Sequence, residues 1–83
     1  MIDYKTLGIG TVIENLRRRN GQTQEELADN ANLERSTINY IERDQGIPNL
    51  SSILNIALAL NMTPSEFFAE IEKQIKILDY YQD

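Results

Sequence analysis

The sequence contains neither cysteine nor histidine. The absence of cysteine excludes disulfide bonds and thiolate chemistry, and it leaves the redox compartment open. The absence of histidine removes the most common general base and the most common metal ligand. No glycine-rich phosphate loop precedes a predicted helix, and the acidic residues between positions 25 and 34 are expected on helix surfaces rather than in a pocket. We therefore expect a protein that is not an enzyme and that holds no metal and no cofactor.

Long hydrophobic runs are absent as well. No segment approaches the roughly 18–20 apolar residues of a membrane span. The first residues, MIDYKTLG, lack the basic and then apolar pattern of a signal peptide. The 83 residues suit one small domain with one modest core. These features predict a cytoplasmic protein without a membrane partner.

Positive charge is scarce, because 8 lysines and arginines stand against 13 aspartates and glutamates, for a net charge of −5. This balance argues mildly against a nucleic-acid partner, since phosphate binding relies on cations. The distribution of charge matters more than the total. The arginines lie at or before Arg43, whereas much of the negative excess follows Ser51. Arg18 and Arg19 belong to a run that is expected to be solvated.

Apolar residues recur with helical spacing along the chain and no strand pattern is present, so the sequence predicts an all-α fold. Gly21 suits a left-handed helix cap, and Asn32 suits a tight turn with a positive φ. Two capping boxes, Thr23 to Glu26 and Thr63 to Glu66, predict helix starts. Asn49 is expected to cap a further helix. The predicted helices cover residues 9–20, 23–30, 34–43, 49–61 and 64–80.

The stretch TQEELADNANLERSTINYIER, Thr23 to Arg43, predicts two short helices joined by a tight turn. Neither has enough apolar residues to be stable alone. Both are therefore expected to pack on a third helix, as in a helix-turn-helix, whose second helix enters the DNA major groove. The outer face of that second helix carries hydrogen-bonding side chains of the kind that read base edges. They are Arg35, Ser36, Thr37, Asn39 and Tyr40.

An ordinary solvated helix face is the alternative for this polar surface, because any amphipathic helix has polar residues outside. For Tyr40 alone, a second alternative is that its ring covers the edge of the core.

Several motifs in register resemble those of the Cro/Xre-type helix-turn-helix family, which includes phage repressors and the controller proteins of restriction–modification systems. The resemblance covers residues 9–68 and implies a five-helix, repressor-like DNA-binding domain over residues 1–68. Such a domain usually acts as a dimeric transcriptional regulator. The motifs are Ile9-Gly10-x-x-Ile13-x-x-Leu16-Arg17, Thr23-Gln24-Glu25-Glu26-Leu27-Ala28, Arg35-Ser36-Thr37-Ile38-x-x-Ile41-Glu42-Arg43 and Pro48-x-Leu50.

The resemblance also implies roles for individual residues. Arg17 and Glu42 stand where the family has a structural ion pair. Arg35, Ser36 and Tyr40 fall where base contacts are usually made. The positions beside the DNA backbone are Gln24, Arg43 and Asn49.

The sequence departs from the family pattern at a few positions. Gln22 occupies a usually apolar position, so the hydrophobic staple onto Leu27 is missing. Glu34 is a weaker helix cap than Ser, Thr or Asp. Asp44 replaces a common glycine, and Gln45-Gly46 replace common basic residues, which removes cations from the DNA side. These departures are expected to affect affinity more than fold.

Residues 69–83 form a predicted extension of the last helix of the same domain, with a narrow apolar seam. Phe67 and Phe68 are expected to pack on their own domain, whereas the far end of the helix projects past a core of this size and needs a partner. The seam therefore predicts a dimer interface, to which Ile56 and Leu58 would add. Its residues are Phe68, Ile71, Ile75 and Leu78.

Two classes of function follow. The first is a sequence-specific regulator that binds double-stranded DNA as a homodimer on a near-palindromic operator. The second is a helix-turn-helix module whose main partner is another protein, such as a toxin that it neutralises, and the acidic balance supports it. A contact with RNA polymerase or another protein is compatible with either class.

Overall fold

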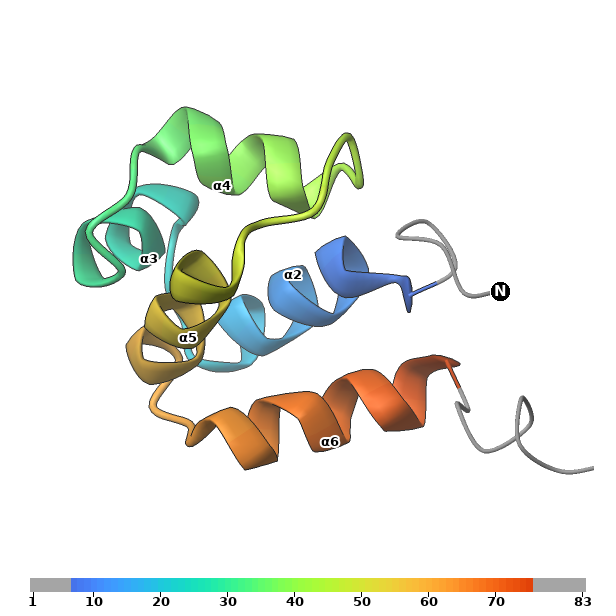
Figure 1. Ribbon diagram of the computed structural model, residues 1–83. Coiled ribbons are helices and arrows are strands. Elements are labelled where there is room, and N and C mark those ends of the chain that lie inside the picture. The colour runs from blue at the N-terminus through green and yellow to red at the C-terminus, as the bar shows by residue number, and fades with distance from the viewer. Residues whose placement is uncertain (1–6, 76–83) are drawn as a thin grey trace, which may run out of the picture.

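The computed structural model describes residues 7–75, and this part of the chain is all-α (Figure 1). Its helices are α2 (Ile9–Arg19), α3 (Gln24–Asn30), α4 (Arg35–Glu42), α5 (Leu50–Ala59) and α6 (Pro64–Ile75). The predicted all-α class is confirmed, and within residues 7–75 the five helices follow one another in the predicted order. The expected continuation of the last helix to Tyr80 lies outside the described residues. Within residues 7–75, every helix is too short or too polar to cross a membrane.

Two capping boxes start helices, as their sequence pattern predicts. At α3, Thr23 Oγ1 accepts a hydrogen bond from the Glu26 amide (3.0 Å), and Glu26 Oε1 accepts one from the Thr23 amide (2.9 Å). The bond from the Thr23 amide lowers the pKa of Glu26, because it stabilises the charged carboxylate. Thr63 and Glu66 make the same pair of bonds before α6, at 3.2 and 2.8 Å. The pattern is readable from sequence because both partners lie three residues apart.

Left-handed residues end or follow several helices. Gly21, Asn32 and Asn61 have φ values of 67°, 57° and 63°, at positions where the sequence predicts a cap or a turn. Asp44 also has a positive φ, 53°. The family often has glycine at this position, and glycine adopts positive φ readily. Its carboxylate Oδ1 accepts a hydrogen bond from the Gly10 amide at 2.9 Å. Aspartate is therefore tolerated there, and it ties the segment after α4 to the first turn of α2.

The hydrophobic core receives side chains from all five helices. Its largest fully buried side chains are Phe67, Ile13, Leu27, Ile38, Ile56 and Leu60. Ala28 is buried where α3 packs against its neighbours, and its small side chain allows a close helix crossing. One expectation is wrong: Ile56 is buried in the core rather than on a dimer surface. Phe68 packs on its own domain only in part, because its ring meets Phe67 edge-on at a centroid distance of 6.1 Å while 44% of its surface stays exposed.

Gly10 lies where α2 passes closest to the end of α4. A Cβ atom at this position would be 2.5 Å from the Ile41 carbonyl oxygen and 2.6 Å from that of Glu42. Both neighbours are backbone atoms, so they can move only if α4 itself shifts. Glycine is therefore required by close approach and not by its backbone conformation.

Gly10→Ala is accordingly expected to destabilise the protein. In a free helix this change is favourable by about 0.5–1 kcal/mol, but overpacking of a fitted interior costs about 1–3 kcal/mol. The second effect should dominate, because backbone atoms must move. Urea denaturation of Gly10→Ala beside Thr11→Ala, an exposed position on the same helix, would measure the difference. Equal midpoints for the two variants would contradict the close approach.

Candidate nucleic-acid interface

Helices α3 and α4 form the helix-turn-helix. They pack against each other, and α4 also packs on α2, while α6 contacts α2 and α5 (Figure 1). In this view α4 and α6 lie at opposite ends of the molecule. Ile38 and Ile41 turn the inner face of α4 into the core. Within residues 7–75, the opposite face of α4 carries the exposed side chains of Arg35, Ser36 and Tyr40.

The predicted base-reading residues all lie on α4 and all keep some exposed surface. Arg35 and Ser36 are exposed, Thr37 and Asn39 are half-buried, and Tyr40 is half-exposed. These side chains offer hydrogen-bond donors and acceptors of different lengths along one short helix. The arrangement matches what a helix needs in order to read base edges in a major groove.

Tyr40 has a neighbour that the sequence did not indicate. A Cβ atom on Gly46 would lie 2.5 Å from the Tyr40 ring and from its hydroxyl oxygen. The ring therefore rests on the loop after α4, and Gly46 is the residue that makes room for it. The half-exposed ring covers this loop and also adds to the outer surface of α4.

A buried ion pair joins α2 to α4. Arg17 Nε donates to Glu42 Oε2 at 2.7 Å, and Arg17 Nη2 donates to Glu42 Oε1 at 3.0 Å. The two side chains are only 9% and 3% exposed. Arg17 Nη1 also donates to the Gln22 carbonyl oxygen at 2.9 Å. The bond to Glu42 raises the pKa of Arg17. This is the bidentate bridge that the family resemblance implies.

Gln24 extends this network toward the outer face of α4. Its Nε2 donates to Glu42 Oε1 at 2.9 Å, and its Oε1 accepts from Asn39 Nδ2 at 3.4 Å. The resemblance implies a phosphate contact for Gln24 but no bond to Asn39. No local pattern in the sequence could have revealed this bond, because its partners belong to different helices.

The arginines divide between two sides of the molecule. Arg18 pairs with Glu14 at 2.9 Å, and Arg19 pairs with Glu70 of α6 at 3.5 Å. Arg35 and Arg43 are exposed at the two ends of α4, and they form no ion pair within residues 7–75. The free positive charge of the described residues is therefore concentrated beside α4.

Asn49 lies at the start of α5. Its Oδ1 accepts a hydrogen bond from the Ser52 amide at 2.8 Å, so it caps the helix as the sequence predicts. It is exposed, like Arg43. Two of the three residues expected beside the DNA backbone are thus accessible, while the third, Gln24, is half-buried.

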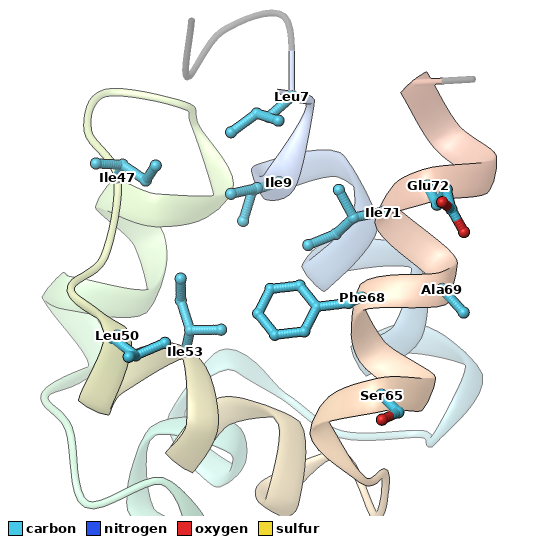
Figure 2. A pocket seen from close by; sticks show the side chains of 10 residues that line it. All are labelled: Leu7, Ile9, Ile47, Leu50, Ile53, Ser65, Phe68, Ala69, Ile71 and Glu72. Atoms are coloured by element: carbon cyan, nitrogen blue, oxygen red, sulfur yellow. The ribbon is translucent and has the colours of Figure 1, made fainter. Parts of the chain in front are cut away.

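An apolar groove of about 700 Å³ lies among α2, α5 and α6 (Figure 2). Three large side chains at its surface stay exposed, Ile47 by 54%, Leu50 by 64% and Phe68 by 44%. Figure 2 shows the ring of Phe68 directed from α6 toward Ile53 of α5. Ile71 is buried and lines the groove from within. The sequence seam identified Phe68 and Ile71 but missed Ile47 and Leu50.

The remaining seam residues are not placed by the structure. The side chain of Ile75 and the whole of Leu78 lie outside the described part of the chain. Leu58, which was expected to add to the seam, is 63% exposed. It borders a different hollow, beside Gln22 and Asn61, and does not line the apolar groove.

Comparison with known proteins defines the class. A helix-turn-helix family profile matches residues 13–67. The crystal structure of the restriction–modification controller protein C.AhdI from Aeromonas hydrophila superposes with a TM-score of 0.71. The two sequences are 36% identical, and the match covers 77% of this chain and 97% of the C.AhdI chain. The controller protein C.Esp1396I, as a tetramer in complex with its natural 35 base-pair operator, gives a TM-score of 0.80 at 31% identity, covering 89% and 97% of the two chains.

A third relative is a much larger protein. The type II methyltransferase M.Sau96I of Staphylococcus aureus is 27% identical over 71 residues, which cover 86% of this chain. This chain spans only 16% of the length of that methyltransferase. With the family profile and the shared fold, the chain belongs to the Cro/Xre-type helix-turn-helix family, a class of DNA-binding regulators.

Proposed function

We propose that this protein is a sequence-specific transcriptional regulator, which binds double-stranded DNA as a homodimer on a near-palindromic operator. The main observation behind this proposal is the exposed outer face of α4. The inner face of the same helix is fixed by the hydrophobic core and by the buried ion pair of Arg17 and Glu42. The operator complex of C.Esp1396I, a relative with the same fold, supports it. Since the ligand is DNA, we place the protein in the cytoplasm.

The proposed DNA contacts are of two kinds, those to base edges and those to phosphates. Arg35 and its neighbours on α4 would contact base edges, which carry sequence information. Arg43, Asn49 and Gln24 would contact phosphates, which fix the position of the protein but carry none. This function requires no catalytic group. The match to the methyltransferase covers 16% of that enzyme, so we assign no methyl transfer to this chain.

Arg35→Ala should remove a base reader. We expect it to weaken operator binding by roughly 1–3 kcal/mol and to relax the preference at one base position of each half-site. Selection of bound sequences from a random DNA pool would measure both effects. Arg18→Ala is the matched control, because Arg18 pairs with Glu14 on α2. An Arg35→Ala variant that selects the wild-type consensus would show that Arg35 does not read a base.

The apolar groove is the proposed homodimer interface. Ile47, Leu50 and Phe68 expose large apolar side chains around one concave surface, and such surfaces usually mark interaction sites. A two-fold axis through this region would repeat the same surface on both copies. The pair of recognition helices would then enter successive major grooves about 34 Å apart. From the sequence seam, we propose Ile75 and Leu78 as further members of this interface.

An electrophoretic shift with the DNA upstream of the protein's own gene tests the proposed function. We expect a retarded band that competitor DNA of unrelated sequence does not remove. The net charge of −5 favours the alternative of a module that binds another protein. Failure to retain any sequence from a random pool at low salt would contradict DNA recognition and would favour that alternative.

A further inference from the structure

Gln24 connects two residues of α4 that lie one helical turn apart. Its amide nitrogen donates to Glu42, and its amide oxygen accepts from Asn39. Glu42 is a fixed anchor, because its carboxylate is almost fully buried and binds Arg17 through both oxygens. The nitrogen end of Gln24 is therefore held in place, and this orients its oxygen toward Asn39.

The bond to Gln24 determines which polar atoms of Asn39 remain for a ligand. An asparagine amide has two N–H groups and one carbonyl oxygen. One N–H group of Asn39 donates to Gln24, which leaves the second N–H group and the oxygen available. A side-chain amide with one free donor and one free acceptor binds the major-groove edge of adenine, where it donates to N7 and accepts from the N6 amino group.

We propose that Gln24 is a positioning residue for base recognition, and that it orients Asn39 to read an adenine. This inference rests on the proposed DNA-binding function. It adds a second role for Gln24 to the phosphate contact proposed above. A phosphate contact alone would affect all DNA sequences equally, whereas a positioning role affects the preference at one base position.

Two single variants and their combination separate these roles. Wild-type protein is expected to select adenine at one position of each half-site from a random DNA pool. Asn39→Ala should lose this preference. Gln24→Ala should reduce the same preference by about tenfold and leave the other positions unchanged. The double variant should discriminate no less at this position than Asn39→Ala alone, because Gln24 acts through Asn39.

Controls address folding and local packing. Gln24→Met keeps the length of the side chain but removes both hydrogen bonds, so it should show the same loss as Gln24→Ala. Gln74→Ala changes an exposed glutamine on α6 and should preserve the wild-type consensus. Melting temperatures of all variants would confirm that each is folded during selection.

The outcomes distinguish this inference from the proposed function. If Gln24→Ala and Gln24→Met weaken binding to all sequences by one factor and keep the adenine preference, Gln24 only holds phosphate and the inference is overturned. It is also overturned if Asn39→Ala keeps the wild-type consensus. If wild-type protein selects no sequence at all, the proposed function itself is wrong.

Discussion

Glu42→Ala is expected to lower the free energy of unfolding by about 3 kcal/mol, the largest single effect on stability that we predict. The substitution leaves the Arg17 guanidinium buried and without its bidentate partner. It also removes the acceptor of the Gln24 amide. A buried charge without a partner lowers stability far more than an exposed ion pair raises it, because water cannot reach the buried group to replace the missing partner. In a domain of this size the loss corresponds to a fall in Tm of about 12–24 °C.

Thermal and urea denaturation would measure this change, and Arg18→Ala provides the control. Arg18 and Glu14 also form a pair, but their side chains are 68% and 39% exposed. Breaking an exposed pair should cost less than about 1 kcal/mol. A Tm of Glu42→Ala equal to that of Arg18→Ala would mean that the buried pair does not support the fold.

Phe68→Asp is expected to give a folded monomer that binds the operator at least about 100-fold more weakly. Phe68 is partly exposed in the single chain, so its replacement should preserve the core. Replacement of the buried Ile71 would instead disrupt the core. In the proposed dimer the new carboxylate would be buried against the partner without compensation. Loss of the dimer separates the two recognition helices, so each must bind its half-site alone.

Sedimentation at micromolar concentration and a salt titration of DNA binding would test this result. Each phosphate contact contributes about −0.9 to the slope of log affinity against log salt, so the monomer should show roughly half the wild-type slope. Leu58→Asp is the matched control, since Leu58 is exposed on α5 but lies outside the groove. Wild-type protein that sediments as a monomer, or a Phe68→Asp variant that remains dimeric, would contradict the proposed interface.

The helices and their ends were predictable from the sequence, because the interactions that fix them are local. The capping boxes at Thr23 and Thr63 join residues three positions apart. Asn32 and Asn61 adopt left-handed conformations that depend mainly on their own side chains. The resemblance to a family of known fold then implied the packing of these helices and the polar outer face of α4.

The location of Phe68 shows where local pattern was insufficient. Ile71 lies four residues after Phe67 and three after Phe68, so helical spacing is compatible with either phenylalanine facing the core. Only the rotation of α6 against α2 and α5 decides between them. It buries Phe67 and turns Phe68 into the groove. The packing of α5 has a similar effect, because it buries Ile56 and leaves Leu58 exposed.

The all-α class, the helix boundaries within one or two residues over positions 9–61, and the set of polar side chains on α4 follow from the sequence. How those side chains connect with one another follows from the packing of the helices. The hydrogen bonds that Gln24 accepts from Asn39 and donates to Glu42, and the bond that Gly10 donates to Asp44, join residues far apart in the chain. Their formation depends on the distance and angle between packed helices, which residue spacing within one helix does not specify.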